Sequence, residues 1–301
     1  VFQQRMIQLG LNGLELDGGA TPGLVDLLMS DLSVYGFEAP IYFDESAPLA
    51  LSEDDLYAKA CIVMEATTGN VLFAHEADTQ LYPASTTKIM TLLLALERGG
   101  LDQEITIPAC AADVPKDSSL VPVYEGEQML YGLIIRSGND AANAVAELCA
   151  GSVDAFVARM NARAYELGMT GTHFVNPHGY HDPDHYTTAR DLATLTRQGL
   201  TDPTFCQIVT CLRYALPATS KRGELVIENA YEIFKPDSPF YIEGAAGVKS
   251  GYTSRAGFCY VGAAQRNGQT LIAVILDAPT RNRAWTDLKR LFAYGFAFLE
   301  S

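Results

Sequence analysis

The sequence has little positive charge and no long hydrophobic run. It carries 21 Lys and Arg residues against 36 Asp and Glu residues, which gives a formal net charge of −15. A partner with a phosphate backbone or an anionic lipid surface requires clustered positive charge, so we expect neither nucleic acid nor an anionic membrane as a partner. The longest apolar run, from Ile89 to Leu96, is much shorter than the roughly 18 residues that cross a bilayer. We therefore expect no membrane span within this chain.

Cysteine is also scarce. Six cysteines among 301 residues are too few for a disulfide scaffold, and no Cys-x-x-Cys pair is present. Cys149 and Cys259 lie in apolar stretches, which is typical of core thiols. What the sequence does contain is apolar material: 48% of its residues are hydrophobic and 19% are charged. That balance predicts a folded chain with a large core and excludes a largely disordered one.

The spacing of the apolar residues predicts strands at both ends of the chain and helices between them. Two pairs of apolar runs are each joined by a turn signal, namely Ala58–Glu65 with Asn70–His75 and Gly257–Ala264 with Gln269–Leu276. The second turn, Asn267-Gly268, is the strongest short hairpin signal. Helical periodicity follows Tyr82 and Asn139 and returns at Trp285. This order predicts an α+β fold in which helices cover an antiparallel sheet.

The first feature with catalytic potential lies at the start of a predicted helix, in Pro83-Ala84-Ser85-Thr86-Thr87-Lys88. Ser85 and Lys88 are three residues apart, so they share one helix face. A serine hydroxyl is a poor nucleophile until a base removes its proton, and a lysine with a lowered pKa can act as that base. Taken alone, the pair is more typical of a helix cap beside a solvated lysine.

Two further motifs change that interpretation. Ser137-Gly138-Asn139 precedes a predicted helix and offers a hydroxyl that can relay a proton and a carboxamide that can hold a peptide. Gly247–Thr253 contains Lys249, Ser250 and Gly251, which together can bind a carboxylate on a strand. Each motif alone is ordinary, but the three in this order form the signature of penicillin-binding proteins and class A β-lactamases.

The chain resembles the low-molecular-mass D-alanyl-D-alanine carboxypeptidases, penicillin-binding proteins that trim peptidoglycan stem peptides. The likeness runs from about Ala58 to Phe298 and includes, beyond the motifs, Cys61–Leu72, Tyr131–Leu133, Asn139–Ala142, Glu166–Met169, Thr172–Gly179 and His185–Asp191. It implies a β-lactamase/transpeptidase-like fold, with a five-stranded antiparallel sheet flanked by helices and a mostly helical subdomain.

The resemblance implies a role for each residue of the first two motifs. Ser85 would be the nucleophile that forms an acyl-enzyme, and Lys88 would be its base. Ser137 would shuttle the proton toward the leaving D-alanine amine, and Asn139 would hold the substrate backbone. A second cation, Lys249, would favour the neutral amine that a base requires.

The third motif is implied to hold the substrate's terminal carboxylate. Lys249 and Ser250 would bind it, with Gly251 beside them, and the N–H groups of Ser85 and Tyr252 would form the oxyanion hole. Ser250 stands where threonine is usual in the family. Because serine also carries a hydroxyl, we expect the level of activity to change but the activity not to be lost.

The expected function is that of a serine D,D-carboxypeptidase that removes the terminal D-alanine from stem pentapeptides. β-Lactams would acylate Ser85, and no metal or cofactor is expected. The resemblance further implies a part in peptidoglycan synthesis and cell shape. It also implies an extracytoplasmic location, either secreted or anchored by a segment that is not in this chain.

Four alternatives are open at this point. A D,D-endopeptidase acting on cross-links would use the same residues, and a protein of the same fold could bind muropeptides without turning them over. A zinc site is suggested by His178, His181 and His185 with Asp182 and Asp184, but a loop broken by Pro and Gly is poorly suited to it. Glu166 lacks the surrounding loop of a β-lactamase glutamate.

The expected domain organisation has two parts. Residues 1–45 form a helical extension or linker, in which Gln3–Gly10 and Asp17-Gly18 weakly resemble a peptidoglycan-binding module. Residues 46–301 form the serine D,D-peptidase domain.

Overall fold

The computed structural model describes residues 51–100, 111, 114–115, 119–120, 126–218, 223–229 and 231–300. The extension predicted for residues 1–45, and its boundary with the peptidase domain, lie outside these residues. Both remain predictions.

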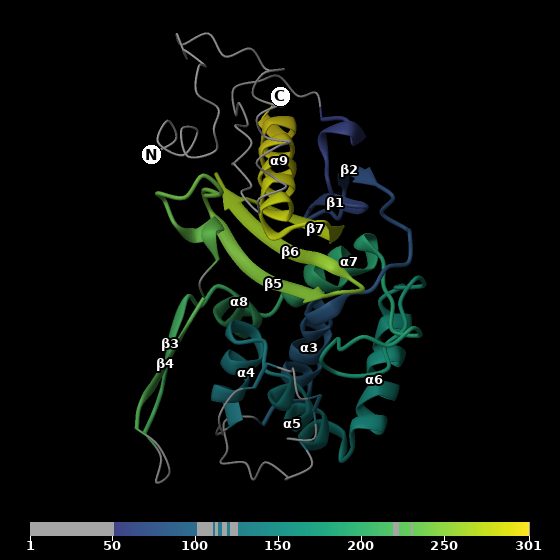
Figure 1. The fold of residues 1–301 in the computed structure, drawn as a ribbon, viewed down its shortest axis with the longest axis vertical. Coiled ribbons are helices and arrows are strands. Elements are labelled where there is room, and N and C mark those ends of the chain that lie inside the picture. Colours follow the sequence, from purple (N-terminus) through teal and green to yellow (C-terminus); the bar gives the residue numbers. More distant parts are fainter. Residues whose placement is uncertain are drawn as a thin grey trace, which may run out of the picture. The chain divides into compact units, whose positions relative to one another are not determined.

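A five-stranded sheet forms the centre of the described residues (Figure 1). Its strands are β1 (Ala60–Glu65), β2 (Val71–His75), β5 (Ala245–Thr253), β6 (Gly257–Arg266) and β7 (Gln269–Ala278). They lie in the order β2-β1-β7-β6-β5, and every neighbouring pair is antiparallel. Strands β1, β6 and β7 are covered on both faces, so the central residues of each form a continuous apolar run and do not alternate. The predicted five-stranded antiparallel sheet is confirmed.

The turn between β6 and β7 shows how local sequence sets the strand register. Asn267 and Gly268 have φ angles of 49° and 79°. A two-residue hairpin whose central residues both have positive φ matches the right-handed twist of its strands, and Asn-Gly adopts it at low cost. The hairpin predicted from this dipeptide is therefore present.

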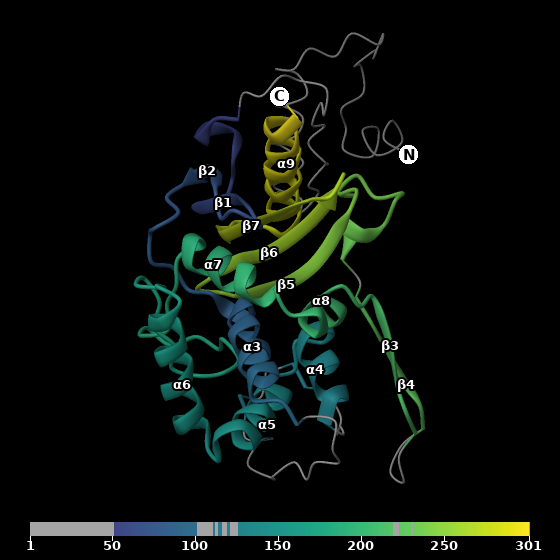
Figure 2. The ribbon, with the colours of Figure 1, turned by 180° about the vertical axis from the view of Figure 1, so that it is seen from behind.

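Helices cover both faces of the sheet (Figures 1 and 2). Helix α9 (Arg281–Glu300) packs on one face. The other face is covered by α7 (Ala189–Gly199) and α8 (Pro203–Val209) together with a helical group that consists of α3 (Lys88–Arg98), α4 (Gly126–Ile135), α5 (Asn139–Ala150) and α6 (Val153–Glu166). Two hydrophobic cores result, one on each side of the sheet, and the helical subdomain implied by the resemblance is present.

Shorter elements connect these layers. They are the 3₁₀ turns η1 (Glu53–Asp55), η2 (Ala84–Thr87) and η4 (Glu232–Phe234) and the two-stranded hairpin of β3 (Arg213–Leu216) and β4 (Leu225–Glu228). The hairpin lies apart from the main sheet, on the side of α4 (Figures 1 and 2). Turn η2 is the element that carries Ser85.

A buried carboxylate on α9 is hydrogen-bonded to the backbone of the segment that leads into β1. Asp287 of α9 has no exposed surface, and its Oδ2 accepts hydrogen bonds of 2.8 Å from the backbone N–H groups of Tyr57 and Ala58. Burial raises the pKa of Asp287 to about 6, against these hydrogen bonds and the charges of Arg290 and Arg283, which lower it. The carboxylate therefore costs stability when it is ionised.

Asp287→Asn is expected to change how unfolding depends on pH. A carboxyl whose pKa is raised by folding contributes stability while it is protonated, and that contribution is lost as the pH rises through about 6. The variant lacks this loss, so its free energy of unfolding should gain about 2 kcal/mol relative to the wild type between pH 4 and pH 7. Denaturant titrations of both proteins measure the difference, and curves that stay parallel would contradict the assignment.

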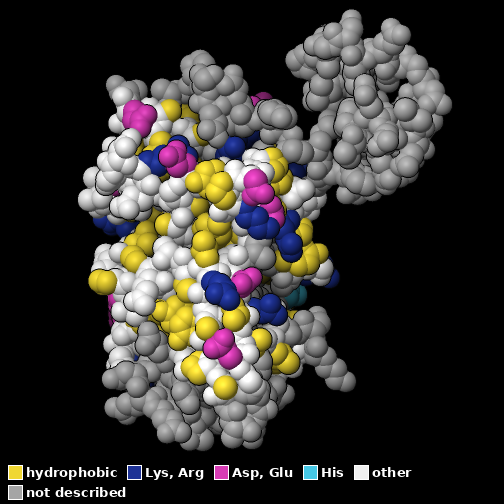
Figure 3. Space-filling view, turned by 90° about the vertical axis from the view of Figure 1, so that its left-hand side faces the viewer, with side chains coloured by type: hydrophobic (Ala, Val, Ile, Leu, Met, Phe, Trp, Pro, Cys, Tyr) yellow, Lys and Arg dark blue, Asp and Glu magenta, His cyan; other side chains and the backbone are white. Residues whose placement is uncertain are grey.

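The face of the molecule shown in Figure 3 does not carry charge of one sign. On the face shown in Figure 3, Lys and Arg side chains are interspersed with Asp and Glu side chains and with hydrophobic ones. Among the described residues, no single helix has the length and apolar composition to cross a membrane. Helices α5 and α6 reach that length only as a pair bent by 84°.

Candidate active site

Ser85 lies in the 3₁₀ turn η2 and not in the α-helix that follows it. Its neighbour Ala84 has a φ of 48°, which an α-helix does not accommodate, and the regular helix begins at Lys88. The Thr87 hydroxyl donates to the carbonyl of Ala84 at 2.8 Å and holds this conformation. A Cβ atom added at Gly179 would lie 1.7 Å from the same carbonyl oxygen, so glycine is required where this loop packs on the turn.

A buried histidine completes this support. His185 is 2% exposed, and its Nδ1 accepts the backbone N–H of Val175 at 3.1 Å. Its Nε2 must then carry the proton and donate to the Thr87 hydroxyl at 2.8 Å. Burial lowers the pKa of His185 to about 3, so the ring is neutral at ordinary pH. The chain from His185 through Thr87 to Ala84 therefore fixes the backbone beside Ser85.

Of the other histidines considered for a zinc site, His178 accepts a backbone hydrogen bond as His185 does, and His181 makes a ring contact instead. His178 Nδ1 accepts the backbone N–H of Tyr180 at 3.1 Å, and burial lowers the pKa of His178 to about 3. The ring of His181 packs edge-on against Tyr82. Within the described part of the chain, no group of three His, Cys, Asp or Glu side chains is arranged to hold a metal ion.

Lys88 is fully buried beneath Ser85. Its Nζ lies 3.0 Å from Ser85 Oγ, 2.7 Å from Asn139 Oδ1 and 2.7 Å from the carbonyl oxygen of His178. Burial holds the pKa of Lys88 well below its usual value, the charge of Lys249 lowers it further, and Asp140 acts in the opposite direction. The amine is thus shifted toward the neutral form.

The partners of Lys88 also orient its lone pair. The amide oxygen of Asn139 and the carbonyl oxygen of His178 can only accept hydrogen bonds, so they take both protons of a neutral amine. The remaining direction points to Ser85, where the nitrogen lone pair can accept the hydroxyl proton. This arrangement suits a general base that activates a serine.

Strand β5 passes directly beside Ser85. A Cβ atom at Gly251 would lie 2.7 Å from the Ser85 amide nitrogen and 3.0 Å from the carbonyl oxygen of Pro83, so only glycine permits this approach. Lys249 is 1% exposed and donates to the carbonyl of Ser250 at 2.9 Å. Burial lowers the pKa of Lys249 to about 7. Tyr252, in contrast, is 57% exposed.

A cavity of about 550 Å³ opens over these groups. Its lining includes Ser85, Asn139, Gly179, Tyr180 and Tyr252. Of the eight residues implied for the site, Ser85, Asn139 and Tyr252 line this cavity. Lys88, Lys249, Ser250 and Gly251 belong to the same elements, which are η2 with the start of α3, the start of α5, and the second half of β5.

Ser137 is not hydrogen-bonded to the other residues of the site among the described residues. It has a φ of 59°, and its Oγ is buried with no hydrogen-bond partner among the described residues. It also makes no direct hydrogen bond with Ser85 or Lys88 there. A buried hydroxyl without a partner is costly unless another group satisfies it, and a substrate amine would be a suitable partner.

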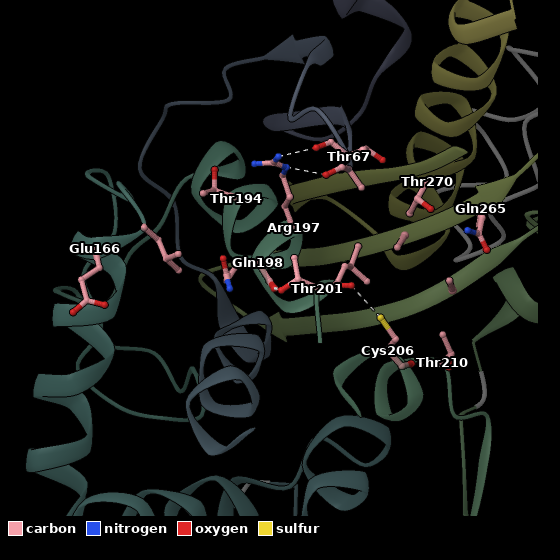
Figure 4. A pocket seen from close by; sticks show the side chains of 15 residues that line it. Thr67, Glu166, Thr194, Arg197, Gln198, Thr201, Cys206, Thr210, Gln265 and Thr270 are labelled. Carbon is pink, nitrogen blue, oxygen red and sulfur yellow. Dashed lines mark hydrogen bonds between the residues drawn. The ribbon is translucent and has the colours of Figure 1, made fainter. Parts of the chain in front are cut away.

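A hollow larger than the one at Ser85 lies elsewhere. It measures about 890 Å³ and is lined mainly by threonines, glutamines and small apolar residues around Arg197 (Figure 4). Arg197 donates to the carbonyls of Ala66 and Thr67 at 2.8 Å, and Cys206 donates to the carbonyl of Leu200 at 3.4 Å. No nucleophile in it is paired with a base, so size alone does not identify the active site.

Comparison with known proteins agrees with this geometry. The family described as D-alanyl-D-alanine carboxypeptidase matches residues 47–280. A D-alanyl-D-alanine carboxypeptidase of Bacillus subtilis is 32% identical over 272 residues, covering 87% of this chain and 68% of the relative, and one of Mycobacterium tuberculosis is 35% identical over 250 residues, covering 80% and 82%. The crystal structure of a DD-transpeptidase of Streptomyces superposes with a TM-score of 0.75 at 30% identity, covering 82% of this chain and all of that one.

A fold with a β-lactamase/transpeptidase-like sheet and a serine–lysine site defines a serine peptidase of the penicillin-binding class. The chain belongs to the D-alanyl-D-alanine carboxypeptidase family. It is a hydrolase with D,D-carboxypeptidase function.

Sequence reasoning missed two side chains beside the site. Tyr231 is hydrogen-bonded to the hydroxyl of Ser250. The guanidinium of Arg281 lies 5.9 Å from the ring centre of Phe258, which packs against Tyr252. Neither belongs to a motif, and only the folded chain brings them to the end of β5.

Proposed function

We propose that Ser85 is the nucleophile of this enzyme and that Lys88 is its general base. The observation that carries the proposal is the 3.0 Å contact between Lys88 Nζ and Ser85 Oγ, made by an amine whose other two hydrogen-bonding directions are taken by carbonyl oxygens. As Lys88 removes the hydroxyl proton, Ser85 Oγ attacks the carbonyl carbon of the penultimate D-alanine. The backbone N–H groups of Ser85 and Tyr252 stabilise the resulting oxyanion.

Collapse of the tetrahedral intermediate breaks the peptide bond and forms an ester on Ser85. The leaving amine of the terminal D-alanine takes the proton that Lys88 removed from Ser85. Ser137, whose Oγ has no hydrogen-bond partner among the described residues, would relay it after moving to within hydrogen-bond reach of Lys88. Water then attacks the ester carbonyl while Lys88 removes one of its protons. The bond between the acyl group and Ser85 Oγ breaks, and Lys88 passes the proton to Ser85 Oγ as the shortened peptide leaves. Serine and lysine are thereby returned to their starting states.

The substrate proposed is a peptidoglycan stem peptide that ends in D-Ala-D-Ala. Its carboxylate would be held by the ammonium of Lys249 and the hydroxyl of Ser250, and its backbone by Asn139. A β-lactam carries a carboxylate and a strained amide in the same relative places, so it would acylate Ser85 and remain there as a stable ester. Since peptidoglycan lies outside the cytoplasmic membrane, we propose an extracytoplasmic enzyme that acts in cell-wall synthesis and cell shape.

A peptide assay tests the function. Incubated with diacetyl-Lys-D-Ala-D-Ala, the wild-type protein is expected to release one free D-alanine per peptide, measured by mass spectrometry. A chelator should leave the rate unchanged. Cleavage of a cross-linked muropeptide dimer at a much higher rate would favour endopeptidase action, and stoichiometric binding without release would favour a non-catalytic peptide-binding protein.

A further inference from the structure

Ser250 has a partner that no motif provides. It lies on β5, directly across from Tyr260 of β6 in the register of the sheet. Its hydroxyl is hydrogen-bonded to the phenol of Tyr231, which immediately precedes η4. The interaction links the carboxylate-binding end of β5 to a residue 19 positions earlier.

The ring of Tyr231 is held in place by aromatic packing. It meets the ring of Tyr260 edge-on, with centroids 5.5 Å apart, and lies nearly parallel to the ring of Phe234 at 6.4 Å. Its backbone N–H donates to Asn229 Oδ1 at 3.1 Å. Burial raises the pKa of Tyr231, so the phenol stays protonated and can donate. The position of its O–H group is thus set by the fold.

A serine needs such a partner more than a threonine does. The γ-methyl of threonine restricts χ1, whereas a serine hydroxyl can occupy three staggered positions. The resemblance to the family leads us to expect threonine at position 250, and serine lacks that restriction. A hydrogen bond to a fixed phenol can select one of the three positions in its place.

The direction of the hydrogen bond also matters. A hydroxyl has one proton to donate and can accept from other groups. If the Tyr231 phenol donates to Ser250 Oγ, the proton of Ser250 remains free to donate to a carboxylate. Linked hydrogen bonds polarise one another, so the carboxylate at the end of such a chain is bound more strongly.

We propose that Tyr231 is a positioning residue for recognition of the substrate carboxylate: its phenol donates to Ser250 Oγ and directs the serine proton into the cleft. The inference rests on the proposed function, in which Ser250 and Lys249 bind that carboxylate. Tyr231 does not touch the substrate and acts through Ser250.

Tyr231→Phe tests this role, because it removes the phenol oxygen and keeps the packed ring. The KM for diacetyl-Lys-D-Ala-D-Ala is expected to rise about 3- to 10-fold, the range of one lost hydrogen bond, while kcat changes less than about twofold. Acylation by a small chromogenic ester that has no carboxylate should be unaffected. KM does not depend on the concentration of active enzyme, so partial unfolding cannot produce this pattern.

Two more variants make the test specific. Ser250→Thr in the Tyr231→Phe background should return KM to within about twofold of the wild type, because the γ-methyl restores the restriction of χ1. Tyr260→Phe is the matched control: it removes a phenol oxygen from the same aromatic cluster, but that oxygen has no hydrogen-bond partner in the described residues. Its KM should equal that of the wild type.

Three outcomes would overturn the inference. They are an unchanged KM in Tyr231→Phe, an equal loss with the peptide and the ester, or a failure of Ser250→Thr to rescue. A wild-type protein that releases no D-alanine would instead overturn the proposed function. The Tyr231 comparison is then made on the apparent affinity for penicillin, which also carries a carboxylate.

Discussion

Ser85→Ala is expected to abolish covalent labelling by penicillin and to lower the release of D-alanine at least about 1,000-fold. The ester intermediate needs the Ser85 oxygen, and Ser137 carries a second hydroxyl that takes part in the proposed mechanism. Ser137 makes no direct hydrogen bond with Lys88 in the described residues, so it is not activated. Intact-protein mass spectrometry after incubation with a penicillin reads out the adduct.

Ser254→Ala is a suitable control for this prediction. Ser254 is an exposed serine in the lining of the same cavity and has no role in the proposed mechanism. It should be labelled like the wild type. An adduct in Ser85→Ala that forms at the wild-type rate would show that another residue is the nucleophile.

The second large effect is expected at Lys88. Lys88→Arg keeps a positive charge beneath Ser85 but replaces an amine that can be neutral with a guanidinium that stays protonated. Because general-base catalysis contributes about 100- to 10,000-fold, kcat/KM should fall by a factor in this range. Lys249→Arg keeps the cation that binds the carboxylate, so its effect should fall mainly on KM.

The pH profile separates the two lysines. The pKa of Lys88 is held well below its usual value, so kcat/KM should rise with pH as this amine loses its proton, far below the ordinary range of lysine. The pKa of Lys249 is about 7, so kcat/KM should fall at higher pH as the carboxylate-binding charge of the free enzyme is lost. Lys88→Arg should lack the ascending limb. A profile with an unchanged ascending limb in that variant would exclude Lys88 as the base.

Much of the fold could be predicted because its signals are local. Asn267-Gly268 specifies a hairpin by itself, and the apolar spacing after Asn139 specifies a helix. The start of the Ser85 helix was less predictable. The residues from Pro83 onward have helical composition, but Ala84 takes a positive φ because the Gly179 loop and Thr87 hold it there, and no local pattern encodes that packing.

The residues of the site also differ in whether the sequence could predict them. Ser85 with Lys88, Ser137 with Asn139, and Lys249 with Ser250 are close in sequence, so motifs reveal them. The His178 carbonyl that orients Lys88 is 90 positions away from it, and the His185 ring that supports Thr87 is 98 positions away. The sequence suggests these histidines as metal ligands. It shows that a histidine side chain can coordinate a metal, but it does not show the hydrogen bonds that the side chain makes in the folded protein.

The hydrogen bonds of Lys88 join segments that are 51 and 90 positions away in the chain. An unfolded chain, or one in which α5 or the His178 loop has come away, presents Ser85 beside an ordinary solvated lysine. Competence for acylation is therefore a property of the complete tertiary structure. A fluorescent penicillin would consequently serve as a reporter of folding: the fraction labelled in a brief pulse would count correctly assembled molecules during refolding.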